Sequence, residues 1–327
     1  MKRFLLLASV LVILLAVLVG CSGIPSVNLE RVNVTFCVDE DVYRTKSITR
    51  GSTISEMVAP EKENEIFIGW FLDKNLSLRY DFSTPVILST TLYAGYVLDT
   101  VALTDMVAED IMRGVVTVHN KCYNTGLGGI VETSSSSSQG SGIVIDVSGG
   151  WCYVLTNHHV VEKLSEYSRQ KITVEDAWGN VYEADIYKND LKSHAALDEN
   201  YDLAVICFKY TDNEKHSLYE IEFASNPTIN ENVISLGTPK GQKNTFTCGK
   251  VITYSKLSNS SDESLSNIAF DIIVHDANIN RGSSGGPLIN AKGQLIGLNF
   301  AGYSDGTYGF AIPVSKINEF LSIYVYN

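Results

Sequence analysis

The chain has 327 residues, of which 45% are apolar and 19% charged, a balance that supports a packed core and excludes wholesale disorder. This length favours two domains over one. The formal net charge is −12. A surface this acidic repels phosphate backbones, which argues against nucleic-acid binding.

The first twenty residues have the pattern of an export signal. Lys2 and Arg3 precede an apolar run over residues 4–19 that only Ser9 interrupts. A basic head before such a run is typical of a secretory signal, and the run is slightly short for a permanent membrane span. It ends in Leu-Val-Gly-Cys at residues 18–21, which resembles the bacterial lipobox. The alternative is an uncleaved signal anchor followed by a chance cysteine.

The lipobox predicts where the mature chain resides. Residues 1–20 are predicted to be a lipoprotein signal peptide, and residues 21–28 a short tether. Lipidation of Cys21 would hold the chain at the extracytoplasmic face of a bacterial cell membrane by burial of its acyl chains. Loss of Lys2 and Arg3 would change the net charge from −12 to −14.

The cysteines show no metal or redox pattern. Six are present, and five remain if Cys21 is lipidated. Export permits disulfides, but Cys152 and Cys207 lie inside apolar runs, where a free thiol behaves as a small hydrophobe. Because there is no C-x-x-C pair, no metal site is predicted, and no cofactor is expected.

Residues 29–97 are predicted to form a small β-rich domain. Alternating or apolar runs at residues 31–36, 65–71 and 91–97 indicate three strands. Residues 51–58 have the pattern of a turn, a cap and a short helix. Five segments in order, at residues 34–36, 51–54, 67–71, 80–86 and 90–94, resemble an internalin-type B-repeat, the Listeria–Bacteroides repeat.

That resemblance implies a β-grasp-like module of bacterial surface proteins. Such modules usually occur in arrays, and a single copy departs from the pattern. A spacer role is the simpler interpretation, with ligand binding as the alternative, and Trp70 is expected in the core.

The rest of the chain is predicted to be a linker followed by an all-β domain. Residues 98–114 form the linker, with a short helix over 99–113, and residues 115–327 carry many short apolar runs separated by Gly, Asn, Asp and Ser. This spacing suits a sandwich or barrel. Residues 133–139 include five consecutive serines and are predicted to be an exposed flexible loop.

Three motifs of the second region carry the chemistry of acyl transfer. Ser284 lies in a Gly-Ser-Ser-Gly-Gly loop before an apolar strand, with Ser283 as the rival nucleophile. His159 follows a predicted strand that ends at Thr156. Asp202 directly precedes the apolar run 203–206. The order His, Asp, Ser is that of the chymotrypsin group and differs from subtilisin and the α/β-hydrolases. Each motif alone has an ordinary structural explanation, but three in this order point to a catalytic triad.

Residues 115–321 resemble the protease domain of the HtrA/Deg family. The matching segments are 140–145, 155–161, 201–205, 235–239, 276–288 and 309–313. The resemblance implies a double β-barrel with the active site between the barrels. It selects His159, which directly precedes Val-Val, over its neighbour His158, although the swapped assignment stays open.

The resemblance also implies the role of each residue. Ser284 would attack the peptide carbonyl, His159 would transfer the proton, and Asp202 would orient His159. The backbone of Gly282, Ser283 and Ser284 would form the oxyanion hole, with the N–H groups of Gly282 and Ser284 as donors. The primary pocket is expected around the following residues: Asn278, Ile279, Asn299, Phe300 and Ala301. In trypsin-like enzymes an acidic residue in the primary pocket binds Lys or Arg of the substrate, and this sequence has no acid at that position. An uncharged, aliphatic substrate residue is therefore expected directly before the scissile bond. A library of peptides that vary at this residue tests the expectation.

Residues 314–327 leave room for one terminal helix, so the PDZ module common in the family is expected to be absent. Substrate capture by a PDZ module, as in the family, is therefore not expected of this chain. The resemblance also leaves the oligomeric state open, although the family typically forms trimers. The sequence predicts a membrane-tethered serine endopeptidase acting on protein substrates through an acyl-enzyme. The rival hypothesis is a surface binding module that retains an inactive protease-like scaffold.

Overall fold

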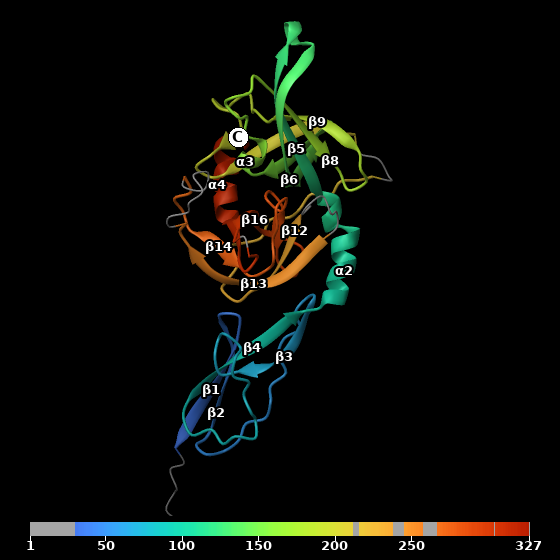
Figure 1. Ribbon diagram of the computed structural model, residues 1–327. Helices are drawn as coiled ribbons and strands as arrows, with labels where there is room; N and C mark the ends of the chain where they lie inside the picture. The colour runs from blue at the N-terminus through green and yellow to red at the C-terminus, as the bar shows by residue number, and fades with distance from the viewer. Residues whose placement is uncertain (1–29, 212–215, 238–244, 258–266, 304, 327) are drawn as a thin grey trace, which may run out of the picture. The chain divides into compact units, whose positions relative to one another are not determined.

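The computed structural model describes residues 30–211, 216–237, 245–257, 267–303 and 305–326 (Figure 1). The predicted signal peptide and Cys21 lie outside these residues. These described residues divide into two compact units, the first built from residues 30–58 and 70–93, the second from residues 59–69 and those from 94 onward. None of the described helices has the length and apolar character needed to cross a membrane.

The first unit contains β1, β2 and parts of β3 and β4 of a four-stranded mixed sheet with the order β2-β1-β4-β3, and residues 65–69 and 94–98 of this sheet are assigned to the second unit. The strands of the sheet are β1 (Arg31–Val38), β2 (Asp41–Thr49), β3 (Glu65–Phe71) and β4 (Thr90–Leu98), so all three strands predicted here are confirmed. Strands β1 and β4 pair in parallel. The Trp70 ring is fully buried, edge-on to Phe36 at 4.8 Å, and its Nε1–H donates to the Met57 carbonyl at 2.7 Å. Trp70 is therefore a core residue, as expected.

The short helix predicted over residues 51–58 is wrong. This segment is irregular after a turn at Gly51. Ile54 and Met57 are both buried, which explains the helix-like spacing of their apolar side chains. The backbone bonds elsewhere, however: the Gly51 N–H donates to the Val86 carbonyl, and the Val86 N–H donates to Ser52. Tertiary pairing with residue 86 replaces the local hydrogen bonds of a helix.

The second unit contains two six-stranded barrels, which confirms the predicted double barrel. The first closes in the order β11-β7-β6-β5-β8-β9, because β11 pairs with both β7 and β9. Its strands are β5 (Val115–Gly126), β6 (Val131–Ser148), β7 (Trp151–Thr156), β8 (Arg169–Glu175), β9 (Val181–Ile186) and β11 (Leu203–Lys209), with β10 (Leu197–Asp198) outside the ring. The second closes as β12-β13-β14-β17-β16-β15. Its strands are β12 (Asn232–Gly237), β13 (Thr245–Ser255), β14 (Ile272–His275), β15 (Pro287–Ile289), β16 (Leu295–Gly302) and β17 (Gly309–Pro313).

The largest apolar cluster joins the two barrels. It combines residues of the first barrel, such as Leu155 and Leu203, with residues of the second, such as Leu298. Two helices add to it: α2 (Thr100–Glu109), the predicted helix of the linker, which Asp99 caps, and α4 (Val314–Tyr324), the predicted terminal helix. Burial of this apolar surface holds the barrels against each other.

The serine run departs from expectation because it forms a strand. Residues 134–138 belong to β6 and pair in antiparallel register with Asn120–Asn124 of β5, Ser138 opposite Asn120 and Ser134 opposite Asn124. Their side chains are mostly exposed, as predicted. The prediction of a flexible loop considered only composition, whereas the partner strand supplies the backbone hydrogen bonds that a serine-rich segment needs.

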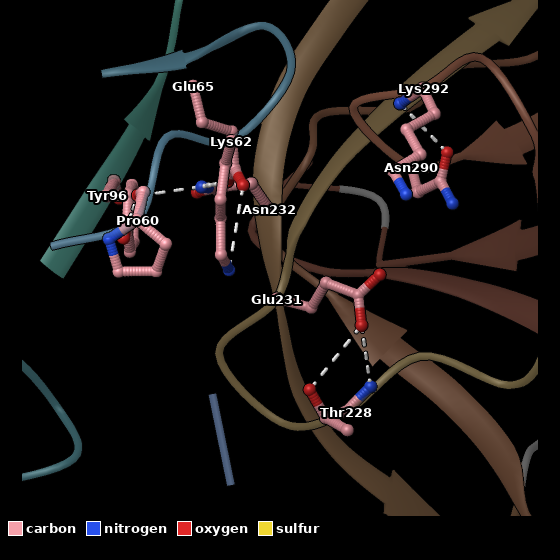
Figure 2. Close-up of polar contacts among 9 residues, drawn as sticks. All are labelled: Pro60, Lys62, Glu65, Tyr96, Thr228, Glu231, Asn232, Asn290 and Lys292. Atoms are coloured by element: carbon pink, nitrogen blue, oxygen red, sulfur yellow. Dashed lines mark hydrogen bonds and ion pairs between the residues drawn. The ribbon is translucent and has the colours of Figure 1, made fainter. Parts of the chain in front are cut away.

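Residues 59–69 contribute polar contacts to the second unit (Figure 2). The Tyr96 hydroxyl donates to the Pro60 carbonyl at 2.7 Å, and the Lys62 ammonium lies 3.8 Å from the Glu65 carboxylate. The Asn232 side-chain amide, at the start of β12, donates to Glu65. These bonds tie an early segment of the chain to a strand of the second barrel.

Candidate active site

The clearest feature of the site is the contact between His159 and Asp202. His159 lies in the short helix α3 (His158–Val161) that follows β7, and Asp202 lies just before β11. The Nδ1 atom of His159 is 2.9 and 3.0 Å from the two oxygens of the Asp202 carboxylate, and the His159 backbone N–H donates to the same carboxylate at 3.0 Å. The carboxylate is buried and the imidazole is half-buried. A buried carboxylate on Nδ1 orients the ring and favours a proton on that nitrogen.

The turn that carries Asp202 is held from several sides. Asp202 has φ of 50°, a left-handed conformation that Asp tolerates better than most side chains. The Asn157 side chain donates to the Asp202 carbonyl at 3.0 Å. On the other side, the hydroxyl of Tyr324 in helix α4 donates to Asp198 at 2.6 Å. Helix α4 thus helps to fix the segment that precedes Asp202.

Ser141 connects the loop that carries Ser284 to the first barrel. The Ser141 N–H donates to the Ser284 carbonyl at 2.7 Å, and the Ser141 hydroxyl donates to the Gly282 carbonyl at 2.7 Å. A Cβ added to Gly140 would lie 3.0 Å from the Ser284 carbonyl and 2.6 Å from a methyl group of Val160, which follows His159. The segments bearing His159 and Ser284 therefore meet at the same glycine.

In the loop expected to form the oxyanion hole, the backbone N–H of Ser283 is already hydrogen-bonded within the loop. The Ser283 N–H donates to the Asn280 carbonyl at 2.9 Å, and the buried Ser283 hydroxyl accepts the Asn280 N–H at 3.2 Å. Ser283 therefore closes the turn of the loop rather than facing a ligand. Gly282 has φ of 99°, which favours glycine. The assignment of the Gly282 and Ser284 N–H groups as oxyanion donors stays a prediction.

The residues expected near the primary pocket have different environments. The Phe300 carbonyl accepts the Ser284 hydroxyl at 3.1 Å, and Ile279 lies against Gly302 two residues further along β16. Ala301 is half-buried and Asn278 is exposed. Asn299 is fully buried, and its side-chain amide donates to the Ser235 hydroxyl and the Pro287 carbonyl. Asn299 thus binds the segment that carries Ser284, and the Phe300 carbonyl lies beside the Ser284 hydroxyl.

His275 is a buried residue that the sequence did not single out. Its Nε2 atom lies 3.1 Å from the Asn299 side-chain oxygen, and no described residue offers its Nδ1 atom a hydrogen bond of good geometry. Burial lowers the pKa of His275 from 6.5 to about 4. The ring is therefore neutral near pH 7, with Nε2 donating to Asn299. Asn299 in turn accepts the Gly285 N–H through its carbonyl at 2.8 Å.

The site contains no candidate metal centre. Within the described part of the chain, no three His, Cys, Asp or Glu side chains are grouped as metal ligands. Cys152 is a buried free thiol and Cys207 a partly buried one.

Replacement of Gly285 by alanine tests how tightly the loop that carries Ser284 is confined. A Cβ at Gly285 would lie 2.0 Å from the Ser141 carbonyl oxygen and 2.5 Å from the Thr156 hydroxyl, so Gly285→Ala must displace the loop. We expect reaction of Ser284 with a fluorophosphonate probe to slow by about 100-fold, the order expected for a reacting group displaced by 1 Å. Gly149→Ala is the matched control, because Gly149 also has positive φ but no atom within 4 Å. Equal labelling rates in the two variants would contradict this account.

Acidification is expected to destabilise the second unit through His275. An unfolded histidine binds its proton with a pKa near 6.5, whereas the folded pKa is about 4. The unfolded state therefore binds more protons between these values, and stability is lost as the pH falls through this window, by about 3 kcal/mol when complete. The neighbouring Asp276 carboxylate favours the charged ring and offsets part of the burial penalty.

The measurement is the urea-unfolding midpoint at pH 7, 6 and 5 for the wild type and for His275→Gln. Gln keeps a polar side chain without a titrating group, so the variant is expected to lose less stability on acidification. The same pH slope in both proteins would show that His275 does not contribute.

Comparisons with known proteins identify two domains in the chain. Residues 140–298 match the family described as trypsin-like peptidase domain, and residues 33–95 match the Listeria-Bacteroides repeat domain. A probable periplasmic serine endoprotease DegP-like of Buchnera aphidicola is 35% identical over 186 residues, covering 55% of this chain and 35% of that protein. The putative serine protease HhoA of Synechocystis is 33% identical over 181 residues, covering 55% of this chain and 41% of that protein.

The structural comparison concerns the fold alone. The active form of the Rv3671c protease from M. tuberculosis superposes with a TM-score of 0.50 at 21% identity, over 68% of this chain and 87% of that one. The chain spans well under half of the length of the curated relatives it matches. It contains a Listeria-Bacteroides repeat domain followed by a trypsin-like peptidase domain that is homologous to the HtrA and DegP serine proteases.

Proposed function

We propose that this protein is an extracytoplasmic serine endopeptidase that cleaves protein substrates with Ser284, His159 and Asp202. The observation that supports this most directly is the buried Asp202 carboxylate on Nδ1 of His159, combined with the Ser141 bridge that holds the Ser284 loop against the same barrel. Homology to HtrA and DegP proteases supports the same chemistry.

The proposed reaction begins with attack of the Ser284 hydroxyl on a peptide carbonyl. His159 accepts the hydroxyl proton on Nε2 and donates it to the leaving amine, which leaves an acyl-enzyme on Ser284. Asp202 keeps the Nδ1 proton in place and stabilises the imidazolium. The N–H groups of Gly282 and Ser284 stabilise the oxyanion, at about 3 kcal/mol for each donor in comparable enzymes. Water then hydrolyses the acyl-enzyme by the reverse proton transfers.

One preparatory step follows from the hydrogen bond of the nucleophile. The Ser284 hydroxyl donates to the Phe300 carbonyl, so it must leave this acceptor before it can donate to His159. A substrate backbone N–H bound to the Phe300 carbonyl would compete for this acceptor. Substrate binding would thereby favour the reactive orientation of the hydroxyl.

The first test is covalent labelling by a fluorophosphonate probe. We expect the wild type to be labelled and Ser284→Ala to lose labelling completely, because the probe reacts only with an activated hydroxyl. Ser283→Ala is the matched control and is expected to retain labelling, since the Ser283 hydroxyl only accepts the Asn280 N–H.

The adjacent histidines provide a second control. His159→Ala is expected to abolish labelling and His158→Ala to preserve it, whereas the reverse result would exchange their roles. Asp202→Asn is expected to reduce kcat by about 10⁴-fold through the wrong tautomer of His159. Wild-type protein that neither reacts nor cleaves unfolded protein would favour the alternative, a surface binding module with an inactive scaffold.

We also propose that Cys21 carries a lipid that anchors the protein at the outer face of the bacterial membrane. The basic head, the apolar run and the Leu-Val-Gly-Cys sequence support this. The relative from Buchnera is described as periplasmic, which agrees with export. A single short tether, residues 21–28, would then separate the lipid from the first domain.

Replacement of Cys21 by serine tests the anchor in a lipoprotein-exporting bacterium. We expect Cys21→Ser to lose incorporation of a palmitate analogue, because the thioether can no longer form, while Cys248→Ser, which changes an exposed thiol elsewhere, keeps it. Membrane association of Cys21→Ser with unchanged lipid labelling of the chain would contradict the proposal. If Cys21→Ser and Cys248→Ser both stay at the membrane and neither incorporates the palmitate analogue, residues 1–20 act as an uncleaved signal anchor.

A further inference from the structure

Asp202 occupies the last position of a tight turn between two paired strands. β10 and β11 pair in antiparallel register up to Asp198 and Leu203. The Asp202 N–H donates to the Glu199 carbonyl at 3.2 Å, which closes the turn. With φ of 50°, the backbone of Asp202 has a conformation that residues other than glycine keep only where their surroundings impose it. The direction of its carboxylate toward His159 therefore depends on the contacts that hold this turn.

Tyr201, the residue before Asp202, connects the turn to helix α4. Its hydroxyl donates to the Glu319 carboxylate at 2.5 Å, and its ring lies against Phe320, with 5.9 Å between the centroids. The ring is also 5.9 Å from that of Phe270, which precedes β14. Burial and the hydrogen bond to Glu319 raise the pKa of Tyr201 to about 12, so the hydroxyl keeps its proton and stays a donor. The side chain is thus held at its tip and along its ring.

A second pair of groups holds the other end of the turn to the same helix. The Tyr324 hydroxyl donates to one oxygen of Asp198, whose other oxygen accepts the backbone N–H of Asn200 at 2.8 Å. The hydrogen bond to Asp198 and burial raise the pKa of Tyr324 to about 12. Two tyrosine hydroxyls, one from the turn and one from the helix, therefore join α4 to both ends of the turn.

Helix α4 is itself fixed in place. The Asn189 side-chain amide donates to the Val325 carbonyl, just after the helix, at 2.7 Å. The Glu319 carboxylate that receives the Tyr201 hydroxyl is also paired with the Lys316 ammonium at 2.6 Å. The cluster that joins the two barrels includes three apolar residues of the helix: Ile317, Phe320 and Leu321. A hydrogen bond to this helix therefore fixes the turn relative to both barrels.

The contact between Asp202 and His159 is sensitive to rotation of the turn. Nδ1 of His159 lies 2.9 and 3.0 Å from the two carboxylate oxygens, an arrangement that a small rotation of the carboxylate would disturb. Asn157 holds the Asp202 carbonyl, and Tyr201 holds the preceding peptide. Resting on the proposed function, we propose that Tyr201 is a positioning residue of the triad. Its hydrogen bond to Glu319 fixes the Asp202 carboxylate against Nδ1 of His159.

Removal of one hydroxyl tests the proposal. Tyr201→Phe keeps the ring and loses the hydrogen bond to Glu319. Tyr254→Phe is the matched control, because the Tyr254 hydroxyl of β13 likewise donates to one acceptor, the Pro227 carbonyl, at 2.6 Å. The maximal rate of fluorophosphonate labelling is expected to fall about tenfold in Tyr201→Phe alone. This is less than the loss of about 100-fold for a 1 Å displacement, because Asp202 keeps its other contacts.

The kinetics distinguish positioning from a general loss of structure. Each variant loses one hydrogen bond, so the two urea-unfolding midpoints are expected to fall by similar amounts. Unfolded protein lowers the amplitude of labelling and leaves its rate constant unchanged. The probe concentration at half-maximal rate is expected to be the same in both variants, because the residues expected near the primary pocket are unaltered. Equal rate constants in Tyr201→Phe and Tyr254→Phe would overturn the proposal.

Substitutions of the acceptor test the same bond from the side of the helix. Glu319→Ala removes the acceptor from the exposed face of α4 without changing the turn, and is expected to slow labelling as Tyr201→Phe does. Glu319→Gln keeps a side-chain oxygen for the Tyr201 hydroxyl and is expected to restore most of the rate. The double variant is expected to be no slower than either single variant, because both changes break one bond. Additive losses would contradict this account.

Proton NMR observes the pair of His159 and Asp202 without any substrate. The proton between Nδ1 and the carboxylate gives a low-field resonance. This resonance is expected to move upfield and broaden in Tyr201→Phe and to stay in place in Tyr254→Phe. Slower labelling with an unchanged resonance would locate the effect of Tyr201 outside this pair and overturn the proposal.

The two measurements separate the positioning role from the proposed function. A wild type that does not react with the probe, but whose resonance still depends on Tyr201, would retain the positioning of the pair and refute the peptidase. Normal labelling by Tyr201→Phe with an unchanged resonance would retain the peptidase and refute the role of Tyr201.

Discussion

The candidate site depends on the pair of hydrogen bonds by which Ser141 holds the Ser284 loop. His159 and Asp202 belong to the first barrel, whereas Ser284 precedes β15 of the second, so the proposed triad requires the two barrels to keep a fixed relative position. The apolar cluster between the barrels supplies most of the free energy that joins them, but apolar contact is not directional. The bonds from Ser141 to the carbonyls of Ser284 and Gly282 are each worth about 1 kcal/mol and fix position instead.

The glycines around Ser284 act mainly by allowing close approach. Gly285 lies so near the Ser141 carbonyl, and Gly286 so near the Leu236 carbonyl, that a Cβ would come within 2.0 and 2.2 Å of these oxygens. The Gly-Gly sequence is therefore a steric requirement of packing one backbone against two others. Its effect is to confine the loop that carries Ser284 rather than to make this loop flexible. Asn299 completes the confinement from the opposite side by binding the Gly285 N–H and the Gly286 carbonyl.

The sequence predicted those parts of the site that depend on local pattern. His159 follows an apolar strand and Asp202 precedes one, and both positions are readable from the alternation of apolar and turn residues. The supporting residues were not readable: Ser141 and Asn157 act through contacts across 141 and 45 residues of sequence, and His275 is an ordinary residue of an apolar strand. The two errors have the same cause. Residues 51–58 and the serine run both exchange local preference for pairing with another segment, Val86 in one case and the neighbouring strand β5 in the other.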